Sequence, residues 1–405
     1  MKKLIAPKNE FGVDLVKIFA MFSVLSLHFF LYSGFYELES HGLQAIIHGM
    51  MRMLFYQCVP LFIMITGYLK RNAKFCAAHY IKLIPVLISS LAVGLVTICY
   101  KIFCLNQSFA PIIWLQSLWT FNQPGYGWYI NLYISLFMIT PFINGAYNSL
   151  KTKKQKTAAV IIFIFVSMFA VSINRIPLHG EYIQSIGFIP NYLSGLWPLG
   201  YYIVGMYVAE FRPKISKWRC ALLLFILLLF EAVANYVTTS GNFYGGITFN
   251  NEDCVNVPIA LLIFLMFYDI QIKNIPIRIA AAKISAVSVV FYLLSWIGDD
   301  YFYTKHRAEF KGFSNLTAMF FKIIPIHIIL CLTASLILFA LLKPLNKAIT
   351  APLFKLCSRS VAAENPAPVN PTPVSETESC SDASDVGYDA ESKTDSDTQK
   401  DTVEV

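Results

Sequence analysis

Three ionisable side chains lie in the first long apolar segment of the sequence, residues 11–33: Asp14, Lys17 and His28. In an α-helix Lys17 and His28 would share one face, because eleven residues make about three turns, and they would lie roughly 16 Å apart along the axis. Asp14 precedes Lys17 by three residues, so these two can pair on that face. A buried imidazole is suited to act as a general base. Asp14, Lys17 and His28 would therefore form a polar stripe on one helix face, with a pair of charges at one end and a candidate base at the other.

These residues also have a purely structural interpretation. Asp14 and Lys17 would then mark a membrane interface, and His28 would hydrogen-bond a neighbouring helix. Because ionisable groups in a membrane are costly, each is a functional candidate by default. Three further candidates lie inside later apolar segments: Glu231, Lys322 and His327. For these three we favour a structural role, and Lys322 is able to extend to an interface.

The segments that would position these residues are long and apolar. Of 405 residues, 56% are hydrophobic and only 14% are charged, which excludes an ordinary soluble enzyme and a free nucleic-acid binder. A helix needs about 20 mostly apolar residues to cross a bilayer. Ten stretches meet or approach this length: 11–33, 52–69, 79–100, 127–146, 157–174, 192–209, 219–239, 255–272, 284–301 and 319–342. The sequence thus predicts an all-α integral membrane protein with about ten transmembrane helices.

Lysine and arginine in the connecting segments predict the orientation. Twenty of them lie in alternate segments, at 1–10, 70–78, 147–156, 210–218, 273–283 and 343–359, whereas the remaining connections carry five. Cytoplasmic loops of membrane proteins are enriched in these residues. Both termini are therefore expected in the cytoplasm. The nine cysteines form no CxxC pair, so we expect neither a disulfide framework nor a metal site.

The C-terminal segment has a different composition. Residues 361–405 contain 11 acidic residues and two lysines, a net charge of −9, so the first 360 residues, with 30 basic and 13 acidic residues, carry +17. Large apolar residues are almost missing from this tail, which begins with several prolines. Such a segment buries too little surface to fold, so we expect it to be disordered from about residue 361. A solubilising or tethering role is the simplest interpretation, and contact with the basic loops is the alternative.

Five segments, in order, resemble the membrane acyltransferase 3 family. They are DLVKIFAMFSVLSLHF (14–29), VPLFIMITGYL (59–69), GWYINLYISLFMITPFIN (127–144), WPLGYYIVGMYVA (197–209) and ISAVSVVFYLLS (284–295). The sequence departs from the family pattern at four positions. Lys17 replaces an arginine ten residues before the histidine, Thr66 replaces a serine, and Tyr126 and Ser295 stand near or at positions where the family often has histidine.

The resemblance implies transfer of an acyl group, usually acetyl, from cytoplasmic acyl-CoA to a hydroxyl of a cell-envelope polysaccharide or glycolipid. It implies acyl-CoA as a co-substrate, no bound cofactor and a place in the cell membrane. The implied catalytic residues are His28, Lys17 and Asp14. The expected substrate-binding residues are Thr66, Trp128 and Tyr129 along the acyl path, and Lys70, Arg71 and Lys82 near the CoA phosphates. The basic patch also fits the ordinary excess of positive charge on the cytoplasmic side.

The chain is accordingly divided into a cytoplasmic N-terminus (1–10), a membrane domain (11–345) and a cytoplasmic C-terminal segment (346–405). Its expected partners are acyl-CoA, a cell-surface glycan or lipid-linked sugar, and the bilayer, with no nucleic acid. A transporter or flippase for envelope sugar precursors is the alternative, because kinked helices and buried charges would serve it equally. No internal repeat supports this alternative. A membrane scaffold that acts through its acidic tail is a further possibility.

Overall fold

The computed structural model describes residues 10–37, 42–108, 110–122, 125–174, 192–238, 250–306, 309 and 313–364. All regular secondary structure in these ranges is helical, and no strand occurs among them, which confirms the predicted all-α class. The N-terminal residues 1–9, the connections at 175–191 and 239–249, and the acidic tail from residue 365 lie outside the described residues.

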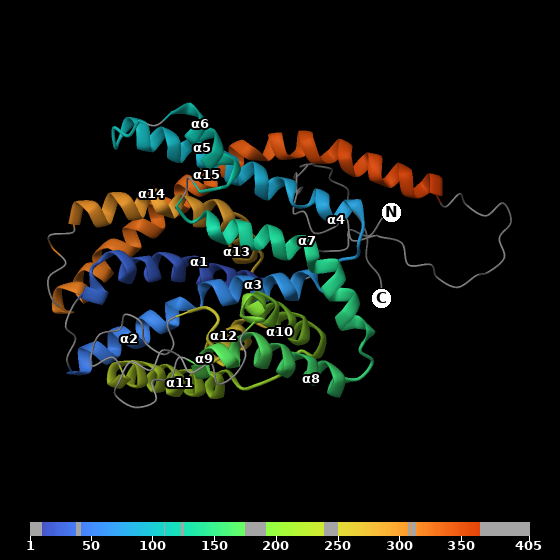
Figure 1. Ribbon diagram of the computed structural model, residues 1–405. Coiled ribbons are helices and arrows are strands. Elements are labelled where there is room, and N and C mark those ends of the chain that lie inside the picture. Colours follow the sequence, from blue (N-terminus) through green and yellow to red (C-terminus); the bar gives the residue numbers. More distant parts are fainter. Residues whose placement is uncertain are drawn as a thin grey trace, which may run out of the picture.

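The helices follow one another in a bundle whose long members run roughly side by side (Figure 1). They are α1 (Phe11–Tyr32), α2 (Gly42–Tyr56), α3 (Cys58–Lys70), α4 (Ala77–Ile81), α5 (Ile84–Phe103), α6 (Pro111–Trp119), α7 (Gly127–Ser149), α8 (Lys153–Ile164), α9 (Ala170–Asn174), α10 (Trp197–Phe211), α11 (Lys217–Thr238), α12 (Asn256–Phe267), α13 (Ile275–Ala286), α14 (Ser288–His306) and α15 (Phe313–Glu364). Short 3₁₀ turns lie at Phe35–Glu37 and Ser194–Leu196, and a π-helical turn at Phe165–Phe169 joins α8 to α9.

Seven stretches of the described chain are long and apolar enough to cross a membrane, and α13 with α14, bent by 62°, makes an eighth if the pair is one span. These eight correspond to eight of the ten predicted segments. The other two, 192–209 and 255–272, coincide with α10 and α12, which have 15 and 12 residues. The chain is thus a multi-pass membrane protein, whereas ten crossings and the side on which each terminus lies stay predictions.

Hydroxyl groups inside these helices bond to their own backbone. Ser23 and Ser26 of α1 donate to the carbonyl oxygens of Phe19 and Phe22, and Thr66 of α3 donates to that of Phe62. Such bonds to the residue four positions earlier satisfy a polar group where no water is present. These side chains therefore tolerate an apolar environment without needing a partner on another helix.

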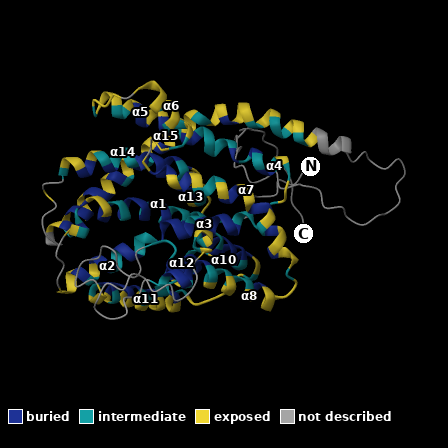
Figure 2. Cartoon of the chain, viewed as in Figure 1, coloured by how far each residue is buried: buried dark blue, intermediate teal, exposed yellow. Residues whose placement is uncertain are grey.

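Helix α1 lies in the middle of the bundle. It contacts α2, α3, α12, α13, α14 and α15, and Figure 2 shows α1, α3 and α10 mostly buried, whereas α6, α11 and the C-terminal part of α15 present exposed residues. Many residues of α1 are almost completely buried, among them Val16, Ala20, Leu25 and Phe29. The stripe identified in the sequence therefore runs through the interior of the protein.

Two glycines allow α3 and α10 to approach closely. A Cβ atom at Gly67 of α3 would lie 2.0 Å from the carbonyl oxygen of Tyr202, and one at Gly205 of α10 would lie 2.0 Å from that of Met64. Small residues commonly permit such backbone contact between membrane helices. This contact holds in place the helix that carries Thr66 and Lys70.

Replacing Gly67 with alanine is expected to destabilise the protein, because the added methyl group meets backbone atoms that cannot rotate away. Overpacking of this kind costs about 1–3 kcal/mol or more. The measurement is the melting temperature of the purified protein in detergent. Gly145→Ala is the matched control, since nothing lies within 4 Å of a Cβ atom at this helical glycine. Equal melting temperatures for Gly67→Ala and the wild type would contradict the prediction.

Candidate functional site

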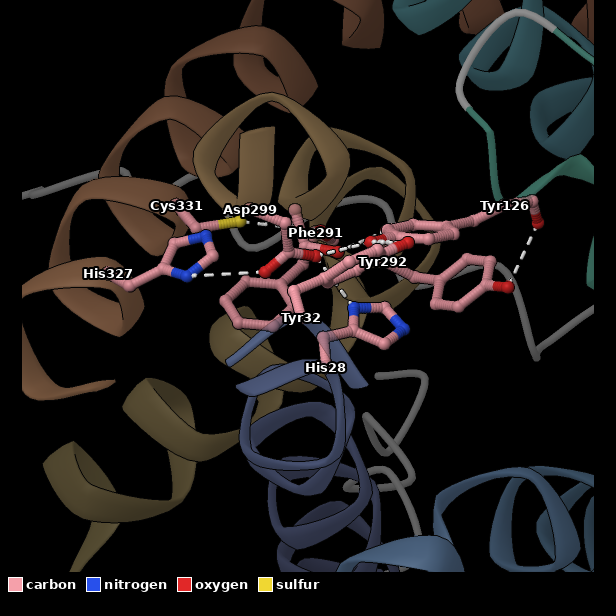
Figure 3. Close-up of polar contacts among 9 residues, drawn as sticks. His28, Tyr32, Tyr126, Phe291, Tyr292, Asp299, His327 and Cys331 are labelled. Carbon is pink, nitrogen blue, oxygen red and sulfur yellow. Dashed lines mark hydrogen bonds and ion pairs between the residues drawn. The ribbon is translucent and has the colours of Figure 1, made fainter. Parts of the chain in front are cut away.

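His28 of α1 is bonded to a carboxylate from the distant helix α14. Its Nδ1 atom lies 2.7 Å from Oδ2 of Asp299, and the hydroxyl of Tyr126, just before α7, donates to the same oxygen at 2.6 Å (Figure 3). The rings of His28 and Tyr126 also pack together, with centroids 4.2 Å apart. An ionised carboxylate can only accept hydrogen bonds, so the tautomer of His28 with its proton on Nδ1 fits this contact, and in that neutral tautomer Nε2 has the lone pair.

The other oxygen of Asp299 faces a second imidazole. His327 of α15 places Nδ1 3.6 Å from Oδ1 of Asp299, and Figure 3 shows the carboxylate between the two histidines. Asp299 and His327 are 2% and 1% exposed. Gly298 makes room for this arrangement, because a Cβ atom there would lie 2.1 Å from Nε2 of His327. A buried carboxylate thus joins α1, α7, α14 and α15.

A small cavity adjoins this cluster. It encloses about 180 Å³ and is lined by Tyr32, Tyr126, Trp296, Asp299, Asp300, Tyr303 and Thr304. The hydroxyls of Tyr126 and Tyr32 lie 3.3 Å apart. Aromatic faces with polar groups between them form the kind of surface that binds a hydroxyl-bearing ligand. We call this the His28-side cavity.

A larger cavity of about 320 Å³ lies toward the other end of α1. Four residues singled out in the sequence line it together: Lys17, Thr66, Lys70 and Tyr129. The other lining residues are Glu10, Phe62, Ile65, Leu69, Ile130, Tyr133, Ser288, Val289 and Tyr292. With two ammonium groups against the one carboxylate of Glu10, the charged part of the lining has a net positive charge, and the rest of the wall is mostly apolar. Such a lining suits a ligand with an anionic end and a less polar remainder. We call this the Lys17-side cavity.

The remaining predicted site residues lie elsewhere. Asp14 accepts a hydrogen bond from Ser285 of α13, and neither it nor Lys17 takes part in an ion pair among the described residues, so the pair expected from the sequence is not formed. Arg71 donates to the carbonyl of Tyr68 at 2.7 Å. Lys82 follows α4, and Trp128 is 47% exposed. Asp14, Arg71, Lys82 and Trp128 line neither cavity. His28 does not line a cavity itself, but it contacts Asp299 and Tyr126, which line the His28-side cavity.

Sequence reasoning overlooked Asp299 and the hydroxyl of Tyr126, and gave His327 only a structural role. Asp299 stands at the end of the predicted span 284–301, so the rule that singled out Asp14 could have found it. Tyr126 carried no such signal, because tyrosine is common at membrane interfaces. Nothing in the sequence indicates that Asp299 of α14, 271 residues after His28, is the partner of His28.

The arrangement can perform proton transfer. A histidine held by a carboxylate on one nitrogen and free to accept a proton on the other is the usual general base for activating a hydroxyl. Among the described residues, no group of three or more histidine, cysteine, aspartate or glutamate side chains is placed to hold a metal ion. The imidazole of His28, held by Asp299 beside the His28-side cavity, is suited to acid–base catalysis.

Comparison with known proteins identifies the family. The family model of an acyltransferase domain, that of the acyltransferase 3 family, matches residues 10–343, from the start of α1 into α15. No curated protein and no solved structure matches the chain. The matched region contains both cavities and the His28–Asp299 pair. Because the match covers most of the chain, this multi-pass protein belongs to the acyltransferase 3 family of membrane acyltransferases.

Proposed function

We propose that this protein transfers an acyl group, most simply acetyl, from cytoplasmic acyl-CoA to a hydroxyl of a cell-envelope polysaccharide or glycolipid in the cell membrane. The observation that carries the proposal is the His28–Asp299 pair, with 2.7 Å between Nδ1 and Oδ2, inside an apolar bundle and beside the cavity that Asp299 lines. Family membership supports acyl transfer in general. The donor, the acceptor and the acetyl group are our inference.

The Lys17-side cavity would bind the donor. Its two lysines, Lys17 and Lys70, are suited to the phosphates of CoA, with the thioester directed deeper toward Tyr129 and Tyr292. In the proposed orientation the first residues of α1 face the cytoplasm, where acyl-CoA is found. Lys17 and His28 lie roughly 16 Å apart along α1, so an extended ligand anchored at Lys17 could approach the imidazole.

The His28-side cavity would bind the acceptor. Nε2 of His28 takes the proton of the acceptor hydroxyl while the oxygen attacks the thioester carbon. The carbon–sulfur bond then breaks, and the leaving thiolate of CoA receives the proton from the imidazolium. Asp299 holds the Nδ1–H group throughout and stabilises the positive charge on the ring.

The direct test is an assay of the purified protein in liposomes with radiolabelled acetyl-CoA and envelope glycan fractions. Label is expected in a glycan or glycolipid product, and alkali should release it as acetate because the new bond is an ester. Movement of the glycolipid across the membrane without any acyl transfer would support the flippase alternative instead. Absence of both label and thioester consumption with every fraction would contradict the proposal.

Lys17 should affect donor binding more than chemistry. Replacement by arginine keeps the charge and is expected to preserve or improve the KM for acetyl-CoA, because guanidinium groups bind phosphate well. Replacement by alanine removes a charged contact of about 1.5–3 kcal/mol and should raise KM roughly tenfold or more. Lys322→Ala is the control, since this side chain is 60% exposed on α15 and outside both cavities. A complete loss of activity in Lys17→Arg would contradict this role.

A further inference from the structure

The two cavities are stacked along one face of α14. Ser288, Val289 and Tyr292 line the Lys17-side cavity, and Trp296, Asp299, Asp300 and Tyr303 line the His28-side cavity. These positions recur every three or four residues, which is one helix face. The boundary between the cavities therefore falls within the single turn from Tyr292 to Trp296, a rise of about 6 Å.

Tyrosine rings occupy this boundary. The hydroxyl of Tyr292 donates to the backbone carbonyl of Tyr126 at 2.9 Å, and the two rings lie 5.9 Å apart. On its other side Tyr292 packs edge-on against Tyr129, at 5.4 Å. Tyr292 and Tyr129 line the Lys17-side cavity, whereas Tyr126 lines the His28-side cavity. Tyr292 thus separates the two spaces.

Tyr126 and Tyr292, which this hydrogen bond joins, differ in their freedom to move. Tyr126 is fixed by a tight backbone turn: Gly125 has φ +69°, and a Cβ atom at Gly127 would lie 1.6 Å from the carbonyl of Phe121. Tyr292 reaches that turn only through its side chain, held by one hydrogen bond and ring contacts. A neutral hydrogen bond contributes about 0.5–1.5 kcal/mol, so the bond to Tyr126 alone would resist rotation of the Tyr292 ring only weakly.

Acyl transfer requires the joining of the two cavities, because reacting atoms must approach to about 3–3.5 Å. We propose that Tyr292 is a positioning residue. Its ring blocks the passage from the Lys17-side cavity to the His28-side cavity and rotates away when the acceptor is bound. This inference rests on the proposed function. Closure has a chemical purpose, since water that reaches the thioester beside His28 would attack its carbon and release the carboxylic acid and CoA. Tyr292 therefore protects acyl-CoA from hydrolysis.

The test compares transfer with hydrolysis in the liposome assay, with acetyl-CoA as donor. Tyr292→Ala removes the ring and should raise the ratio of released acetate to transferred acetyl at least tenfold. Tyr292→Phe keeps the ring but loses the bond to Tyr126, so a smaller rise of a few-fold is expected. Tyr301→Ala is the matched control: it removes a tyrosine ring from the same helix, but Tyr301 is 50% exposed and lines neither cavity, so its ratio should equal that of the wild type.

The outcomes separate this inference from the function on which it rests. A wild-type protein that transfers no acyl group overturns both. A wild-type protein that transfers acetyl, together with an unchanged ratio in Tyr292→Ala, overturns only the role of Tyr292. If Tyr292→Ala does not fold, as judged by its melting temperature in detergent, Tyr292→Leu takes its place, because leucine keeps apolar volume without the ring or the hydroxyl. An unchanged ratio in that variant overturns the inference equally.

Discussion

Replacement of His28 by alanine is expected to lower the kcat for acyl transfer by a factor of 10² to 10⁴, the range that a well-placed general base contributes. The acceptor hydroxyl would then have no nearby base to take its proton. The KM for acetyl-CoA should change little, because Lys17, which would bind CoA, lies about three helical turns from His28 along α1. Steady-state kinetics with labelled acetyl-CoA measure both constants.

The chain provides a close control for this variant. His306 also places Nδ1 2.7 Å from a carboxylate oxygen, that of Glu309, but this pair is exposed and lies outside both cavities. His306→Ala removes the same chemical groups and should retain nearly full activity. Equal losses in the two variants would indicate general destabilisation, and full activity of His28→Ala would remove this imidazole from the mechanism.

Local sequence patterns were sufficient to predict much of the bundle. The eleven-residue spacing of Lys17 and His28 correctly placed them along one buried helix, because helical periodicity is a local property. Eight of the ten apolar segments match stretches long enough to span a membrane, for the same reason. The exact ends were less accessible. The predicted segment 52–69 corresponds to two helices, α2 and α3, which start at Gly42 and are separated at Gln57. The start at Gly42 was missed because α2 is more polar than a typical span.

Contacts between distant helices were not predictable. Asp14 was expected to pair with Lys17 three residues away, but α13 brings Ser285 to it instead. Tyr126 stands near a position where the family often has histidine, and only the structure shows that its hydroxyl completes the contacts of Asp299. Such partners depend on how α13 and α14 pack against α1 and on where the turn before α7 meets α14, and no spacing in a single sequence records that packing.

Replacement of Asp299 by asparagine should also lower the kcat for acyl transfer strongly. The side chain keeps its shape, but an amide can donate a hydrogen bond to Nδ1 of His28 as well as accept one. This favours the tautomer with the proton on Nε2, which then cannot accept the proton of the acceptor. A fall in kcat on the order of 10²–10⁴ is expected, as for other histidine bases that lose their carboxylate. The KM for acetyl-CoA should stay within about twofold.

Asp300→Asn is the matched control, because this neighbour lines the same cavity but accepts its hydrogen bond from Tyr100 rather than from a histidine. The fall in kcat of Asp300→Asn should be at least tenfold smaller than that of Asp299→Asn. The Asp299→Asn protein should still fold, since asparagine keeps nearly the same volume and the replacement removes a buried charge without introducing another. Folded Asp299→Asn protein with wild-type kcat would show that the carboxylate does not orient His28 for catalysis, and the proposed proton transfer would then need a different base.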